Sequence, residues 1–244
     1  MRSCAERTRR SGLAASREVG VGLLGYGTVG AAVDRLLVEN ADDIERATGH
    51  RLRVVRALVR DPGRERGFDP GAGVLTTEFA TVRDDPEVAL VAEVMGGVDP
   101  TGGYVLELLG AGKPVVTANK QLLAQRGSEL FEAAAAANVQ LRFEASVCGA
   151  IPVIKVLRES LVSTNVHRVL GIVNGTTNFI LTEMEGGASY DEALAEAQRL
   201  GFAEADPTDD VSGADAAAKM AILATIAFGS RVTLADVDYR GVED

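Results

Sequence analysis

The segment at residues 25–30, Gly-Tyr-Gly-Thr-Val-Gly, constrains the fold of this chain more than any other. It follows an apolar run at residues 19–24 and leads directly into a helical pattern with Val29, Val33 and Leu36 on one face. A strand, a tight glycine turn and a helix in this order are typical of dinucleotide-binding folds, where the backbone approaches a pyrophosphate at the helix N-terminus. The alternative is an ordinary turn, which a chain with 27 glycines can also form. The residues predicted to bind the cofactor are Gly25, Tyr26, Gly27, Thr28, Val29 and Gly30.

Apolar runs and helical patterns then alternate as far as residue 143. We predict strands at residues 52–59, 88–95, 115–117 and 141–143, and helices at residues 100–109 and 122–137. This alternation favours an α/β fold with a Rossmann-like open parallel sheet, in which ligands bind beyond the carboxyl ends of the strands. Lys120 follows one of those ends and is therefore a candidate site residue.

The end of the strand at residues 52–59 bears on the choice of cofactor. An acidic residue at this position usually binds the ribose 2′-hydroxyl of NAD, whereas an Arg suits the 2′-phosphate of NADP. Here Arg60 comes first and Asp61 follows it. The sequence therefore favours NADP and leaves NAD as the alternative.

Beyond residue 162 the pattern changes. We predict a strand at residues 166–173 and helices at residues 179–185 and 189–200, the last with Ser189 and Glu192 as a capping box. A further helix is predicted from Pro152 through residue 161. We expect a dinucleotide-binding domain at residues 17–145 and an α+β substrate domain, or large insertion, at residues 146–244.

An acidic loop in the second domain leads into an Ala-rich helix. The loop carries Glu204, Asp206, Asp209 and Asp210, carboxylates suited to a cationic ligand. The helix places Asp215 and Lys219 four residues apart on one face, where a simple surface ion pair is the alternative interpretation. Of the 25 basic residues only four are Lys: Lys113, Lys120, Lys155 and Lys219. Because Lys exchanges a proton more readily than Arg, each Lys is a stronger candidate for proton transfer.

Composition excludes several classes of function. A net charge of −10 disfavours nucleic acid as a partner, and no apolar run approaches the ~20 residues that span a bilayer. Cys4 and Cys148 form no disulfide framework, and two histidines make no zinc site. Residues 1–16 are expected to be a disordered tail without a signal peptide, which favours a cytoplasmic protein.

Isolated reactive residues have ordinary alternatives. Cys148 lies close to a predicted helix start, where a thiolate is favoured, but a small buried filler is the preferred interpretation. His50 and His167 are predicted to be surface residues.

These motifs together resemble bacterial homoserine dehydrogenase over nearly all of residues 19–244. The match rests on the glycine turn, on Thr117-Ala118-Asn119-Lys120, and on residues 143–154, 171–179 and 201–219. The last segment contains the specific spacing Asp-Asp-x-x-Gly-x-Asp-x-x-x-Lys, which ends at Lys219.

The resemblance implies NAD(P)-dependent interconversion of L-homoserine and L-aspartate 4-semialdehyde, in the pathway to threonine, methionine and isoleucine. It implies Lys219 as the proton donor with Lys120 nearby, and Gly201 and Lys120 beside the cofactor. Such a proton would neutralise the alkoxide that hydride transfer creates. The residues implied in substrate binding are Glu204, Asp210, Asp215, Gly175 and Thr176. A sodium ion is implied on the backbone carbonyls of Glu144, Val147, Gly149 and Ile151.

Two departures from the family qualify this expectation. Phe202 stands where the family commonly has Tyr, and the chain ends at Asp244 where family members continue. We therefore expect the substrate domain to be incomplete at its C-terminus, and we expect a homodimer formed through that domain. The rival hypotheses are an aspartate-semialdehyde dehydrogenase that uses Cys148 and a catalytically incompetent NAD(P)-binding piece.

Overall fold

The computed structural model describes residues 17–242, and the predicted tail at residues 1–16 lies outside this range. The chain divides between Met95 and Gly96 into two compact units, which are described in turn. No helix within the described range is long and apolar enough to cross a lipid bilayer.

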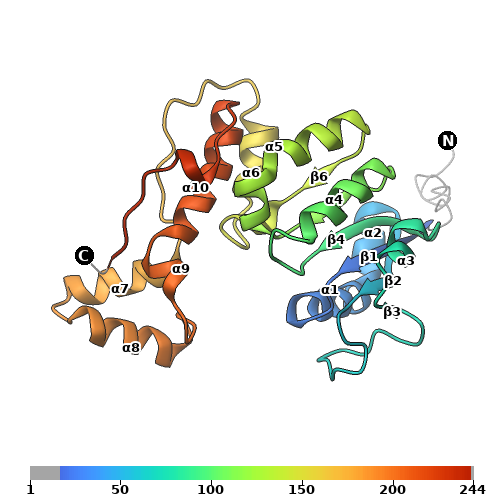
Figure 1. The fold of residues 1–244 in the computed structure, drawn as a ribbon, viewed down its shortest axis with the longest axis horizontal. Helices are drawn as coiled ribbons and strands as arrows, with labels where there is room; N and C mark the ends of the chain where they lie inside the picture. The colour runs from blue at the N-terminus through green and yellow to red at the C-terminus, as the bar shows by residue number, and fades with distance from the viewer. Residues whose placement is uncertain (1–16, 243–244) are drawn as a thin grey trace, which may run out of the picture. The chain divides into compact units, whose positions relative to one another are not determined.

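The first unit is built on parallel strands (Figure 1). Strand β1 pairs in parallel with both β2 and β4, and Leu24 lies opposite Leu58 on one side and Glu93 on the other. Val21, Leu23, Val54 and Ala57 form its buried core with Tyr26. Its elements are β1 (Arg17–Leu24), α1 (Thr28–Glu39), α2 (Ala41–Thr48), β2 (His50–Leu58), β3 (Leu75–Thr76), α3 (Phe79–Asp84) and β4 (Val88–Glu93).

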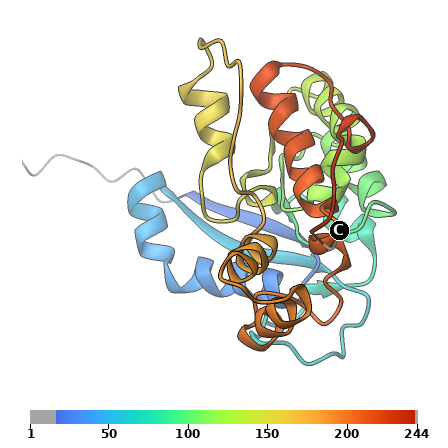
Figure 2. The same cartoon turned by 90° about the vertical axis from the view of Figure 1, so that its left-hand side faces the viewer.

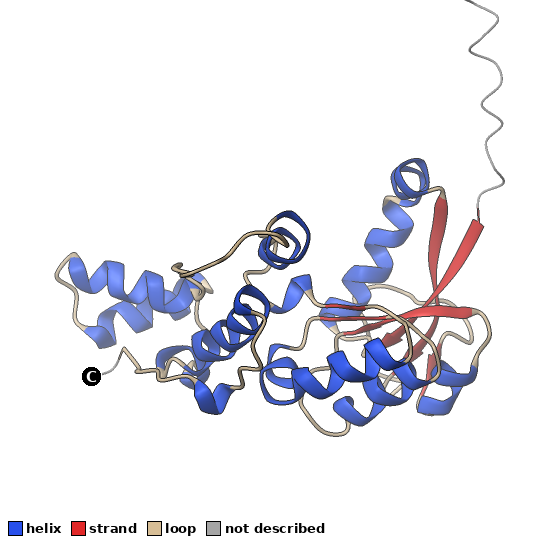
Figure 3. Ribbon diagram, turned by 90° about the horizontal axis from the view of Figure 1, so that it is seen from above, coloured by secondary structure: helices blue, strands red, loops and turns tan. Residues whose placement is uncertain are grey.

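The second unit begins with more α/β structure and continues as helices (Figure 3). Strands β5 and β6 pair in parallel, with Val115 opposite Leu141. Its elements are α4 (Thr101–Gly110), β5 (Val115–Thr117), α5 (Lys120–Ala136), β6 (Leu141–Arg142), η2 (Glu144–Ser146), α6 (Val153–Lys155), the π-helical η3 (Val156–Ser160), α7 (Gly175–Glu185), α8 (Tyr190–Leu200), α9 (Thr208–Val211), α10 (Ala214–Phe228) and η4 (Leu234–Asp236).

Two apolar clusters organise the helices of this unit. Helix α10 packs against α5 through the small side chains Ala124, Ala218 and Ala221, as Figure 2 shows for the red and green helices. Small residues let two helices approach closely, which brings the N-terminal part of α10 towards the start of α5. Helices α7 and α8 form a separate pair around Ile180 and Ala197.

The strand order is β3-β2-β1-β4-β5-β6. This order is characteristic of doubly wound dinucleotide-binding folds. The predicted α/β Rossmann-like class is therefore confirmed, as is the strand at residues 115–117. The capping box at α8 is also confirmed, because Ser189 accepts from the Glu192 amide while the Glu192 carboxylate accepts from the Ser189 amide.

One predicted element is wrong. Residues 166–173 do not form a strand, and Leu170 and Ile172 are 82% and 75% exposed. An isolated extended segment is not a strand until a neighbour accepts its backbone hydrogen bonds, and the described residues provide none for it. The helix predicted from Pro152 to residue 161 is present: α6 continues without a break into η3, and the part that the sequence pattern did not predict is the π-helical form of η3.

Candidate active site

The three glycines of the turn at residues 25–30 differ in how much space a side chain would have. Gly25 has φ +98°, and a Cβ there would lie 2.9 Å from the Met95 Cα. A Cβ on Gly30 would lie 2.3 Å from the Gly25 carbonyl oxygen, so Gly30 is required where α1 packs against the turn. A Cβ on Gly27 would meet nothing within 4 Å. The open side of the turn is thus at Gly27, where a phosphate can approach the backbone.

The N-terminus of α1 suits an anion. Gly27 is the N-cap, and no side chain caps the helix there. The first amide groups of a helix lack intrahelical partners and carry the positive end of its dipole. The geometry of the turn therefore fits the pyrophosphate of a dinucleotide.

Arg66 connects the loop after β2 to this turn. Its Nε donates to the Tyr26 carbonyl at 3.2 Å and its Nη1 donates to the Pro62 carbonyl at 3.1 Å. Within the loop, the Asp61 carboxylate accepts the Gly63 amide at 2.8 Å, while Arg60 is exposed. The loop that carries both candidate ribose-binding residues is thereby held beside the glycine turn.

A buried carboxylate between two lysines forms the centre of the second unit's polar cluster. Lys120 Nζ lies 2.5 Å from Asp215 Oδ1, and Lys219 Nζ lies 2.7 Å from Asp215 Oδ2. The side chain of Asp215 is 2% exposed, that of Lys219 17% and that of Lys120 34%. The surface interpretation of this ion pair is wrong, because the carboxylate is enclosed and the two ammonium groups lie nearer to solvent.

The environment holds Asp215 in its charged form. Burial, the largest influence, raises the pKa of Asp215. Hydrogen bonds from Lys120, Lys219 and Asn174, with the charge of Lys219, outweigh burial and keep that pKa below its ordinary value. Lys219 is also oriented by donating to the Val173 carbonyl at 2.8 Å. The cluster can therefore present an ammonium group in a fixed direction.

The other predicted substrate residues differ in whether they contact this cluster. Asp210 joins it through Asn174, which donates to Asp210 Oδ1 at 2.7 Å. Thr176 is buried and its hydroxyl donates to the Phe202 carbonyl at 2.6 Å, tying α7 to the turn after α8. Gly175 is the first residue of α7. Glu204 is exposed.

Gly201 ends helix α8 in the left-handed region, with φ +79°. This conformation explains a glycine at the position, because a side chain would be strained there.

The segment predicted to hold sodium forms a tight bend. Gly149 has φ +54° and Cys148 has φ +58°. The Glu144 and Ile151 carbonyls accept backbone amides from Val147 and Val153, and a carbonyl oxygen keeps a second lone pair for another partner. No cluster of three or more His, Cys, Asp or Glu side chains suited to a metal occurs in the described part of the chain. A cation held by the predicted donor set would rest on backbone oxygens of this bend.

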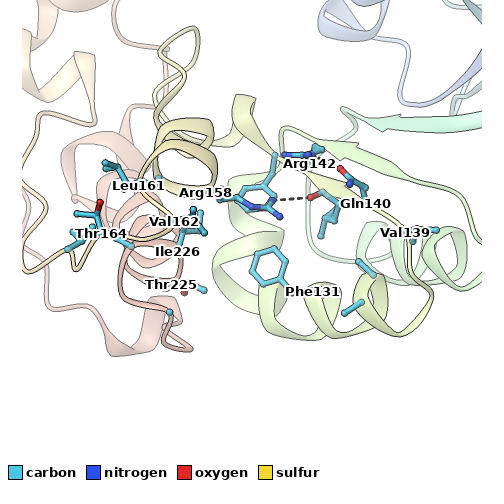
Figure 4. A pocket seen from close by; sticks show the side chains of 18 residues that line it. Phe131, Val139, Gln140, Arg142, Arg158, Leu161, Val162, Thr164, Thr225 and Ile226 are labelled. Atoms are coloured by element: carbon cyan, nitrogen blue, oxygen red, sulfur yellow. Dashed lines mark hydrogen bonds between the residues drawn. The ribbon is translucent and has the colours of Figure 1, made fainter.

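A cavity of about 660 Å³ lies elsewhere in the second unit, and no predicted site residue lines it. Phe131, Val162 and Ile226 contribute to its walls (Figure 4). Arg158 donates to the Leu141 carbonyl at 3.3 Å at its edge.

Asn174 is the cluster residue that sequence reasoning did not select as a site residue. It belongs to the motif at residues 171–179, but its side chain contacts acids from two other helices. Only its position before a helix was visible in the sequence, where an Asn is read first as a cap. The exposed positions predicted for His50 and His167 are confirmed.

The strand order and the glycine turn define the chain as a dinucleotide-binding protein of the Rossmann type. The sequence profile described as "Homoserine dehydrogenase, NAD binding domain" matches residues 25–144, and that described as "Homoserine dehydrogenase" matches residues 152–244. The chain belongs to the homoserine dehydrogenase family.

Individual relatives agree with this assignment. A homoserine dehydrogenase of Bacillus subtilis is 48% identical over 227 residues, covering 93% of this chain and 52% of the relative. The crystal structure of a homoserine dehydrogenase from Thiobacillus denitrificans superimposes with a TM-score of 0.85 and 47% identity, covering 93% of this chain and 53% of that one. A hyperthermophilic archaeal homoserine dehydrogenase in complex with NADPH gives a TM-score of 0.75 and 29% identity, with coverages of 91% and 75%. The chain spans about half the length of the curated relatives that it matches.

Proposed function

We propose that this chain binds a nicotinamide dinucleotide and catalyses the reversible reduction of L-aspartate 4-semialdehyde to L-homoserine. The observation that carries the proposal is the pair of lysines on the buried carboxylate of Asp215, in a member of this family. Residues 17–145 would act as the cofactor domain and residues 146–244 as the substrate domain. In a cell the enzyme would be cytoplasmic and would serve the synthesis of threonine, methionine and isoleucine.

The role of Lys219 follows from its surroundings. A bound nicotinamide would supply the hydride, and reduction of the aldehyde leaves an alkoxide oxygen that needs a proton. Lys219 is held at its ammonium group by Asp215 and by the Val173 carbonyl, so it can donate a proton in a fixed direction. Lys120 shares the same carboxylate and places a second positive charge near that oxygen.

The acids of the cluster would bind the other end of the substrate. The homoserine ammonium group needs a carboxylate partner, and the resemblance assigns Glu204, Asp210 and Asp215 to the substrate. Asp215 already has two lysine partners, whereas Glu204 is exposed and Asp210 receives the Asn174 amide. We therefore assign ammonium recognition to Glu204 and Asp210, with Gly175 and Thr176 shaping the site from the start of α7.

The proposal is tested by homoserine oxidation with Lys219→Ala. We expect kcat to fall by ~10²-fold or more, because the proton donor is lost while Lys120 still neutralises Asp215. Lys155→Ala is the matched control, since Lys155 is exposed and its side chain lies outside the cluster. A Lys219→Ala chain with near-normal kcat at saturating homoserine would contradict the assignment.

We infer NADP as the preferred cofactor, because exposed Arg60 lies at the end of β2 while Asp61 is engaged with the Gly63 amide. Arg60→Ala should raise KM for NADP and leave KM for NAD nearly unchanged. Equal effects on both would remove Arg60 from recognition of the 2′-phosphate.

The sodium site and the dimer are part of the same proposal. Sodium would bind the carbonyls of Glu144, Val147, Gly149 and Ile151, so that replacing sodium by potassium lowers the melting temperature. Equal melting temperatures in both salts would argue against this site.

A homodimer through the substrate domain would cover the exposed Leu170 and Ile172 side chains. Sedimentation of the chain as a monomer at every concentration would exclude that dimer.

The second candidate function is dinucleotide binding without turnover. It is favoured by the open side of the glycine turn at Gly27, which suits a dinucleotide whether or not the cluster at Asp215 turns over a substrate. An increase in NADPH fluorescence on binding, with no oxidation of homoserine, would support it. Comparison with a chain extended by the C-terminal part of a relative would then separate the two functions.

A further inference from the structure

Asn174 uses all of its side-chain hydrogen-bonding groups inside the second unit. Its Oδ1 accepts from the Thr177 amide at 2.8 Å and from the Thr177 hydroxyl at 3.1 Å. Its Nδ2 donates to Asp210 Oδ1 at 2.7 Å and to Asp215 Oδ2 at 2.8 Å. One buried amide therefore links the start of α7 to α9 and α10.

The chemistry of the partners fixes the orientation of this amide. The Thr177 N–H can only donate, so it requires the oxygen of Asn174, and the two carboxylates can only accept when ionised, so they require the nitrogen. A flipped amide would place its oxygen against two negative oxygens. The Asn174 oxygen therefore faces Thr177, and its nitrogen faces the carboxylates of Asp210 and Asp215.

We propose that Asn174 is a positioning residue for the reaction. Its single amide group binds the carboxylates of Asp210 and Asp215 and so holds Asp215 in contact with Lys219. This inference rests on the proposed function of the cluster. Asp215 faces Lys120 from α5, Lys219 from α10 and, across Asn174, Asp210 from α9. In this set Asn174 is the neutral donor, which brings two negative groups together without adding a charge.

The cap of α7 is the competing explanation. Asn, Asp and Ser are about equally good N-caps because each offers an oxygen to the first free amide groups. Asn174→Asp and Asn174→Ser should therefore preserve the cap, while both lose the amide N–H groups that hold Asp210 and Asp215. Ser189→Ala removes a helix cap at α8, away from these acids, and is the matched control for a lost cap.

The first measurement does not depend on turnover. The carboxyl group of Asp215 is followed by carbon-13 NMR during acid titration, with Asp215→Asn used to assign the signal. In Asn174→Ser we expect the midpoint to rise by roughly one pH unit, because a donor to the charged form is lost. In Ser189→Ala the midpoint should stay where it is in the unmodified chain. An unchanged midpoint in folded Asn174→Ser would overturn the proposal.

The second measurement uses kinetics of Asn174→Asp. We expect kcat/KM for homoserine to fall at least tenfold near neutral pH, with KM for NADP changed less than twofold. The ratio to the unmodified chain should recover as the pH is lowered, because the introduced carboxyl group, once protonated, again donates to a neighbouring carboxylate. A variant within twofold of the unmodified chain at every pH would mean that Asn174 is only a cap.

The two measurements separate this inference from the proposed function. If the unmodified chain does not oxidise homoserine, the proposed function fails, and the Asp215 titration alone decides the role of Asn174. If Asn174→Ser unfolds before the titration midpoint, Asn174→Asp decides it through the pH dependence of kcat/KM.

Discussion

Buried polar residues explain most of what is distinctive about this chain at the scale of single side chains. Besides Asp215, the carboxylate of Asp34 is 5% exposed and accepts a hydrogen bond of 2.6 Å from Tyr26 Oη. Burial raises the pKa of Asp34, although the hydrogen bond from Tyr26 acts in the opposite direction. Burial and the bond to Asp34 also raise the pKa of the Tyr26 hydroxyl. Tyr26, predicted as a cofactor residue, thus points its side chain into the core.

The pair predicts a pH-dependent effect of Tyr26→Phe. The pKa of Asp34 is higher in the folded chain than in the unfolded chain, so protonated Asp34 stabilises the fold. This contribution is complete below the pKa of the unfolded chain and is lost as the pH rises through the pKa of the folded chain. Without the Tyr26 donor the pKa of Asp34 rises further, so the stability lost relative to the unmodified chain grows from acid to neutral pH. We expect a loss of about 1–3 kcal/mol at neutral pH by urea denaturation, and a smaller loss near pH 4.

Tyr26→Phe combined with Asp34→Asn is the control, since no ionisable group is left in the pair. The pH dependence caused by Tyr26→Phe should disappear in this background. Equal losses at acid and neutral pH in the single variant would show that Asp34 does not respond to Tyr26.

At the scale of elements, the turn between β1 and α1 separates folding from binding. Gly30 lies against the Gly25 carbonyl, whereas Gly27 faces open space and has an ordinary φ of −86°. The two glycines therefore have different tasks, although the sequence motif treats them alike.

A matched pair of alanine substitutions tests this division. Gly30→Ala should lower the melting temperature, because its Cβ would lie 2.3 Å from a backbone oxygen. Gly27→Ala should melt close to the unmodified chain but bind NADPH at least tenfold more weakly, because the methyl group occupies the phosphate approach. Melting curves and NADPH fluorescence titrations measure the two effects. Loss of stability in Gly27→Ala with unchanged affinity would contradict the assignment.

The elements that sequence patterns predicted well are those with complete local signals. Helix α8 carries its own capping box, and the strand at residues 115–117 ends where its apolar run ends. The segment at residues 166–173 is also rich in apolar residues but has no strand beside it among the described residues. Its local pattern is compatible with a strand, but pairing depends on a second segment that the pattern does not contain.

At the scale of the whole molecule, the order of apolar runs, glycine turns and helical patterns along the sequence determined the α/β class and the dinucleotide-binding turn. The sequence also placed Asp215 and Lys219 on one face of a helix. The class, the turn and this shared face all follow from the residue period of a helix or strand. The tertiary structure decided that Asp215 is buried, that Lys120 from α5 shares its carboxylate, and that Asn174 joins it to Asp210. The physical reason is that a helical period fixes neighbours within a few residues, whereas the packing of α10 on α5 brings together charges that are far apart in the sequence.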